Sequence, residues 1–103
     1  MKAHEEYMLF LEEHPELHSL TKSGLYLSVI LFLAKQGKTM IEIMRSFPSI
    51  EEEDVELIVK SLISVGAVKK INALGKEVYY AEDIGKELLE KYNNAKKDFS
   101  AFE

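Results

Sequence analysis

The chain contains no cysteine among its 103 residues, and it has only two prolines and five glycines. The lack of cysteine excludes disulfides and thiolate metal sites, and it makes a cytoplasmic location the default expectation. The longest apolar stretch, residues 24–34, is about half as long as a membrane-spanning helix must be. The N-terminal segment also lacks the layout of a signal peptide. We therefore expect one compact domain with no membrane span.

Positive charge is scarce, and only one segment has an excess of it. The chain carries 13 Lys and Arg residues against 18 Asp and Glu, which gives a formal net charge of −5. Residues 67–81 hold three lysines and one glutamate, whereas residues 49–66 hold five acidic side chains and one lysine. Binding to phosphates draws on Lys and Arg, so the total argues weakly against a nucleic-acid partner. The local distribution of charge matters more.

Hydrophobic periodicity predicts four or five helices. They cover about residues 5–13, 24–35, 40–46, 50–65 and 83–103. The second of them contains LYLSVILFLA, in which Ser28 is the only strongly polar residue. A helix that is apolar all round is expected to be buried on all sides, either within the chain or by a second subunit.

Local side chains mark where these helices begin and end. Thr39 and Ser49 each stand three residues before a glutamate, which is the capping-box pattern. Thr21 or Ser23 can cap the helix that follows them, residues 24–35. The glycines at positions 37 and 66 are well placed to end helices.

A β-hairpin is predicted between the last two helices. Residues 67–71 and 77–81 are rich in β-branched or aromatic side chains, and residues 72–76 between them have turn chemistry. The predicted fold class is therefore mainly α with a small hairpin.

This order of elements resembles a winged helix-turn-helix domain, in which the hairpin is the wing. The end of the recognition helix and the start of the first wing strand are matched by Val55, Leu62, Gly66 and Val68. The run YYAEDIGKELL at residues 79–89 is similar to the stretch by which MarR-like and PadR-like regulators leave the wing. Ala81 and Glu82 depart from that stretch, where leucine and threonine are usual. The resemblance implies a small transcription regulator, usually a homodimer, that places one helix of each subunit in the major groove.

The helix that would enter the groove begins with an acidic cluster, which comprises Glu51, Glu52, Glu53, Asp54 and Glu56. Carboxylates are repelled by the DNA phosphates. They can accept a hydrogen bond from only a few base groups, chiefly the cytosine amino group. Three interpretations stay open: a solvated face that complements the helix dipole, a surface for a basic protein, or direct base reading.

The hairpin carries three wing lysines, Lys69, Lys70 and Lys76, opposed in the sequence by Glu77 alone. Basic wings hold the phosphate backbone or enter the minor groove, so we predict DNA contacts here. The alternative is a solvated hairpin edge, where lysine discourages strand-to-strand aggregation.

The C-terminal helix carries a terminal seam with 4-3-4-3 spacing, comprising Leu88, Tyr92, Ala95, Phe99 and Phe102. Such spacing is typical of paired helices, and an uncovered aromatic stripe would be unfavourable in water. Together with Tyr7 and Phe10 of the first helix, the seam is the predicted homodimer interface. A ligand pocket between subunits is a second interpretation.

No catalytic motif, metal site or cofactor is predicted. His14 and His18 are four residues apart, but Pro15 lies between them and no third ligand is close in the sequence. The sequence has neither a phosphate-cradling glycine loop nor a nucleophile elbow.

The predicted organisation has three parts. Residues 1–20 form an N-terminal helical extension, residues 21–92 the winged helix-turn-helix, and residues 93–103 the end of the dimerisation helix. The predicted function is that of a non-enzymatic, DNA-associated transcription regulator acting as a homodimer. The alternative is a winged-helix interaction module that binds a basic protein through the acidic cluster and does not bind DNA.

Overall fold

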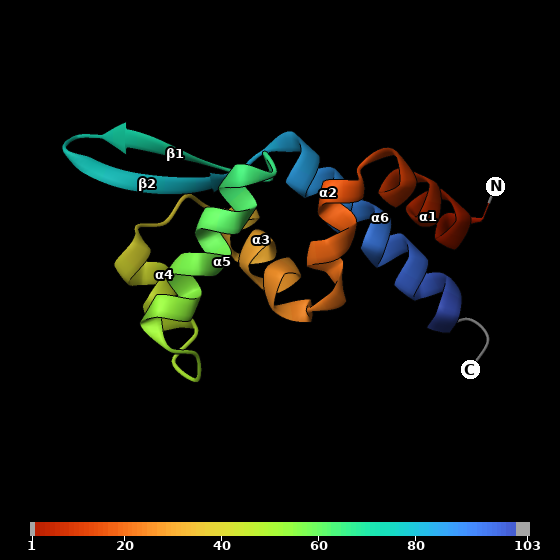
Figure 1. The fold of residues 1–103 in the computed structure, drawn as a ribbon, viewed down its shortest axis with the longest axis horizontal. Helices are drawn as coiled ribbons and strands as arrows, with labels where there is room; N and C mark the ends of the chain where they lie inside the picture. The colour runs from red at the N-terminus through yellow and green to blue at the C-terminus, as the bar shows by residue number, and fades with distance from the viewer. Residues whose placement is uncertain (1, 101–103) are drawn as a thin grey trace.

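A computed structural model describes the backbone of residues 2–100 and the side chains of residues 2–97. Six α-helices, one 3-10 helix (η1) and two strands follow one another in this part of the chain (Figure 1). Their bounds are α1 Ala3–Glu13, α2 Pro15–His18, η1 Ser19–Lys22, α3 Gly24–Lys35, α4 Met40–Ser46, α5 Glu52–Ser64, β1 Val68–Ala73, β2 Lys76–Ala81 and α6 Asp83–Ser100.

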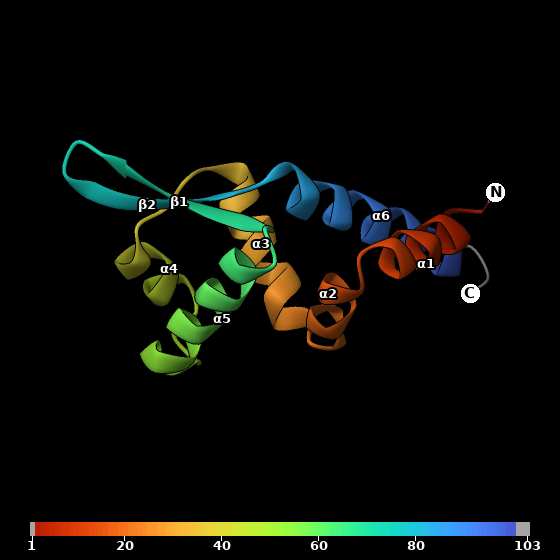
Figure 2. The same ribbon diagram turned by 45° about the horizontal axis from the view of Figure 1, so that its top comes forward.

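The chain is elongated, with extents of 46 × 26 × 21 Å. Its radius of gyration is 14.4 Å, above the roughly 13 Å typical of a 100-residue domain. The hairpin projects at one end, and α1 and α6 lie side by side and antiparallel at the other (Figures 1 and 2). No single helix within residues 2–100 is long and apolar enough to cross a membrane; residues 15–22 and 24–35 reach that length only together, across a bend of 107°.

The core is built around α3, as its apolar sequence predicts. Val29, Ile30 and Leu33 are at most 2% exposed. One stripe of α3 nevertheless faces solvent, and Leu31 on that stripe is 46% exposed. The expectation that α3 is covered on all sides is therefore wrong for the chain by itself.

The described part of the terminal seam packs inside the chain, where α6 lies against α1. Phe10, Leu88 and Ala95 are buried, and the rings of Tyr7 and Tyr92 meet edge to face with centroids 5.9 Å apart. The prediction that a second subunit covers these side chains is not required, because α1 folds back onto α6 within the chain. Phe99 and Phe102 lie outside the described side chains.

The capping box at the start of α4 is confirmed. The Glu42 amide donates to the Thr39 hydroxyl at 3.3 Å, and the Thr39 amide donates to the Glu42 carboxylate at 3.0 Å. Ser23 caps α3, because its hydroxyl accepts from the Leu25 amide at 3.3 Å.

The second capping box, at Ser49, does not form. A turn in which the Ile50 amide donates to the Phe47 carbonyl at 3.1 Å keeps Ser49 outside the helix. The N-cap of α5 is Glu51, whose carbonyl accepts the first helical amides and whose side chain caps nothing.

The hairpin is longer and its turn tighter than the sequence suggests. Paired residues run from Val68 with Ala81 to Ala73 with Lys76, which leaves a two-residue turn. Leu74 and Gly75 in that turn have φ of 52° and 78°. Positive φ at both positions is the type I′ geometry that matches the twist of the strands.

Gly37 does not cap α3, contrary to the prediction. The helix ends with Gln36 in an extended conformation, and Gly37 leads into a short bridge in which Lys38 and Tyr79 exchange backbone hydrogen bonds of 3.0 and 2.8 Å. A Cβ on Gly37 would overlap the Tyr80 ring. The glycine is thus required for the close approach of this segment to the wing.

Gly37→Ala is expected to destabilise the fold by about 1 kcal/mol, because the half-buried Tyr80 ring must swing away. Thermal unfolding should show a fall in Tm of roughly 4–8 °C. Gly24→Ala is the matched control: a Cβ there meets nothing within 4 Å, and the change should be neutral or slightly stabilising. Equal Tm values for the two variants would contradict this role of Gly37.

Candidate nucleic-acid interface

The helix-turn-helix consists of α4 and α5, joined by residues 47–51 (Figure 1). The core face of α5 is made by buried residues at helical spacing: Val55, Ile58, Val59 and Leu62. On the opposite face Glu53, Leu57 and Lys60 are exposed, and Leu57 is 61% exposed. In a winged helix this outer face of the recognition helix is the one presented to the major groove.

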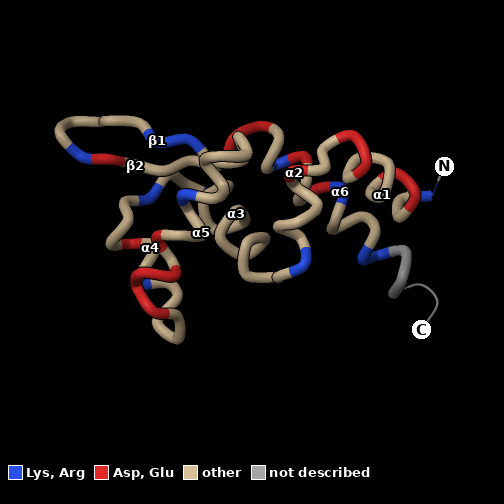
Figure 3. Tube along the Cα trace, in the orientation of Figure 1, with Lys and Arg blue, Asp and Glu red and all other residues tan. Residues whose placement is uncertain are grey.

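The acidic cluster lies at the N-terminal end of α5 (Figure 3). Its first four members are exposed, and Glu56 is half-buried with its carboxylate 3.1 Å from the Lys60 ammonium. Lys60 is the only cation of α5, so the outer face presents negative charge with one locally neutralised lysine. Acidic side chains in a first helical turn stabilise the helix through its dipole, each by about 0.3–1 kcal/mol.

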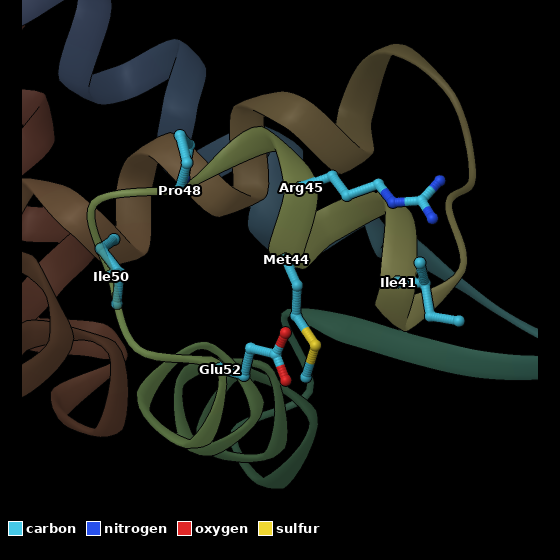
Figure 4. Close-up of a pocket in the computed structure, with 6 residues that line it drawn as sticks. All are labelled: Ile41, Met44, Arg45, Pro48, Ile50 and Glu52. Atoms are coloured by element: carbon cyan, nitrogen blue, oxygen red, sulfur yellow. The ribbon is translucent and has the colours of Figure 1, made fainter.

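A hollow separates the end of α4 from the start of α5 (Figure 4). It is lined by Ile41, Met44, Arg45, Pro48, Ile50 and Glu52. The Glu52 carboxylate lies beside Met44, while the Arg45 side chain extends away from Glu52 along α4 (Figure 4). The Arg45 guanidinium and the Glu52 carboxylate thus point away from each other, although both side chains line the hollow.

The wing lysines do not share one surface. Side chains alternate between the two faces of a strand, and the register pairs Lys69 with Tyr80, Lys70 with Tyr79 and Ala73 with Lys76. Lys69 and Lys76 therefore project from one face, and Lys70 projects from the face that carries the buried Tyr79.

Two of the three lysines have acidic neighbours. The Lys69 ammonium lies 3.2 Å from the Glu82 carboxylate, and the Lys70 ammonium lies 3.6 Å from the Glu77 carboxylate. Lys76 forms no ion pair with any described side chain. Both pairs are exposed and weak, so they can open to meet a phosphate, but they reduce the positive field of the wing.

Lys76 borders a shallow groove between the wing and α4, together with Arg45 and the exposed Ile41. Glu42 also lines it, but its carboxylate is occupied by hydrogen bonds from Thr39. These bonds, from the backbone first and the hydroxyl second, lower the pKa of Glu42, and the charges of Lys38 and Lys76 contribute in the same direction. Two cations, Arg45 and Lys76, thus meet two carboxylates, Glu42 and Glu77, where α4 lies beside the wing.

Two features of this region are not evident from the sequence. Glu82 stands 13 positions after Lys69, and only the register of the hairpin, with Ala81 opposite Val68, brings it beside that lysine. Arg45 lies on α4 and borders a groove with Lys76 of the wing, in a region where Lys38 also bridges to Tyr79. Both juxtapositions join segments that are far apart in the sequence.

The histidines serve local structure where their contacts are described. The His14 ring stacks on Phe10 with centroids 4.5 Å apart, and its Nδ1 lies 3.0 Å from the Phe10 carbonyl oxygen. His18 is exposed in α2. Within residues 2–100 no three His, Asp or Glu side chains are placed to hold a metal ion.

Comparison with known proteins identifies the fold. No protein-family model and no curated protein matches the sequence. Among solved structures, the chain is similar to an ArsR-like transcriptional regulator from Rhodococcus sp. RHA1, with a TM-score of 0.64 at 12% sequence identity. The match covers 88% of this chain and 83% of that one. The prediction of a winged helix-turn-helix, mainly α with a two-stranded wing, is confirmed.

Proposed function

We propose that this chain is a small regulator that binds duplex DNA as a homodimer and catalyses no reaction. The observation that carries the proposal is the exposed helix-turn-helix beside a lysine-bearing wing, in a fold shared with a protein described as a transcriptional regulator. In this proposal the DNA contacts come from residues 21–92. Residues 1–20 and 93–103 contribute to the homodimer.

The electrostatics favour phosphate contacts over base contacts. The positive charge of Lys76 and Arg45 lies beside the groove between the wing and α4, whereas the outer face of α5 is acidic. Lys and Arg contacts to the backbone hold a protein on DNA without regard to sequence. We infer that the wing and α4 supply affinity, and that α5 lowers it for most sequences.

The test is fluorescence anisotropy of a labelled random duplex, titrated with the intact chain at low salt. Saturable binding whose Kd rises steeply with salt concentration is the expected result. Absence of binding at low salt would contradict the proposal. It would favour the second candidate, a module that docks a basic protein partner on the acidic cluster beside the exposed Leu57.

Replacing all three wing lysines with Gln is expected to lower affinity for every duplex severalfold and to flatten the salt dependence. The slope of log Kd against log salt should shrink by about 1 if Lys76 alone meets a phosphate, and by about 3 if all three do. Lys97→Gln is the control, because Lys97 is exposed in the last turn of α6. That end of α6 lies opposite the wing (Figure 1). An unchanged slope would mean that the wing lysines do not contact phosphates. The DNA contact would then be assigned to Arg45, Lys38, Lys35 and Lys22.

A further inference from the structure

α1 carries a stripe of exposed side chains, and Leu9 on this stripe also borders a hollow with Glu87 and Lys91 of α6. The members of the stripe are spaced i, i+3, i+4 and i+7, and all are exposed: Glu5, Met8, Leu9 and Glu12. Met8 is 50% and Leu9 43% exposed. We call this the α1 stripe: two apolar side chains between two carboxylates.

A groove runs between α3 and α6, on a different side of α6 from the packed face of α1. Among the residues that line it are Gly24, Ser28, Leu31, Leu89, Tyr92 and Lys96. Gly24 and Ser28 are small, so the wall of the groove that α3 forms is shallow there. Leu31 in the same wall is 46% exposed. One turn beyond Leu31, the exposed Lys35 continues the same stripe of α3.

We propose that the α1 stripe of one copy occupies the α3/α6 groove of a second copy, and the reverse. This inference rests on the homodimer of the proposed function and assigns its interface. The chemistry is complementary: two exposed apolar side chains flanked by carboxylates meet a groove that exposes Leu31, and Lys35 on the same stripe of α3 faces the carboxylates. The contact would bury Met8, Leu9 and Leu31, large apolar side chains that the isolated chain leaves in water.

The reciprocal arrangement also closes the assembly. Each copy carries both the stripe and the groove, so two equivalent contacts related by a two-fold axis leave neither surface open. The α1 stripe lies on the helix at the end opposite the wing (Figure 2), and no described residue of α4, α5 or the hairpin lines the groove. The helix-turn-helix and the wing of each copy therefore remain free for DNA.

Cross-linking tests the interface directly, because the chain has no cysteine of its own. The Leu9→Cys variant carries an affinity tag that raises its mass, and the Leu31→Cys variant is untagged. The two proteins are mixed and treated with a short bismaleimide. Each variant has one thiol, so every adduct joins two chains. A major product of intermediate mass is expected from this pair. The control pair, Leu31→Cys with Leu57→Cys, should give little, because Leu57 lies on the outer face of α5.

Charge exchange gives a second readout without engineered thiols. Lys35→Glu should raise the dimer dissociation constant about threefold, and adding Glu12→Lys should restore it. Both positions are exposed, so the monomer fold should not change. Light scattering that shows a dimer, together with no selective cross-link and no rescue, would overturn the interface but leave the homodimer. A monomer at all accessible concentrations would overturn both.

Discussion

Replacing Leu88 with Ala should lower the free energy of unfolding by about 2–5 kcal/mol. Leu88 is fully buried in α6 and belongs to the same core cluster as Phe10 and Leu11 of α1. Truncation removes three carbon atoms from a packed site and leaves a cavity that its neighbours fill only in part. Urea denaturation followed by circular dichroism, repeated at several protein concentrations, gives the stability and separates it from dimer dissociation.

Leu57→Ala is the matched control, since it makes the same change at a side chain that is 61% exposed. Its effect on unfolding should stay within about 0.5 kcal/mol. The informative contrary result is a Leu88→Ala variant with the stability of the wild type and a weakened dimer. That outcome would place Leu88 between subunits, where the spacing of the terminal seam alone had put it.

The terminal seam shows how far periodicity can be taken. A 4-3-4-3 pattern indicates that one face of a helix is covered by another helix. The contact of α6 with α1 is consistent with that prediction. The pattern does not state which chain supplies the second helix. That depends on whether the segment after α1 turns the chain back, which α2 and η1 achieve over residues 15–22. A proline boundary in the sequence marks the turn but not its angle.

The fold itself could be predicted because its signals are local. The Thr39 capping box, the left-handed Gly66 after α5 and the strand composition each involve residues a few positions apart. One of the failures is also local, because it is a competition between near neighbours. Ser49 offers a cap, but the turn from Phe47 to Ile50 forms instead and α5 starts at Glu52.

The candidate interface was less accessible to prediction because charges act across space. The wing lysines look like one basic patch in the sequence, since they fall within eight positions of one another. The pleat of the hairpin sends Lys70 to the opposite face, and two carboxylates from other positions lie beside Lys69 and Lys70. Net charge by segment therefore overstated the positive field of the wing.

Neutralising Glu52, Glu53 and Glu56 to Gln together should strengthen nonspecific DNA binding by about tenfold or less. Each screened carboxylate beside a phosphate costs a few tenths of a kcal/mol. The structure adds a second cause, because Gln at position 56 releases the Lys60 ammonium from its ion pair. Anisotropy titration of random duplex at low and moderate salt measures the change, which should shrink as salt rises.

The matched control is the triple change of Glu13, Glu16 and Glu90 to Gln, all at exposed positions away from α5. Both variants raise the formal net charge from −5 to −2, so a difference between them isolates position from total charge. Stability should fall only slightly in the α5 variant. No carboxylate of the acidic cluster caps the helix, and only the interaction with its dipole is lost.

The direction of the change in the α5 variant separates three roles for the acidic cluster. Stronger DNA binding means that the carboxylates oppose phosphates in the usual winged-helix pose. Negligible DNA binding before and after, with a basic protein partner weakened, means that the helix is a docking surface. Strong binding in the wild type that is lost in the variant contradicts both, because it requires the carboxylates to accept hydrogen bonds from bases, chiefly the cytosine amino group. In that case the acidic cluster would be the specificity element of the recognition helix. The wing and α4 would contribute only contacts to the DNA phosphate backbone.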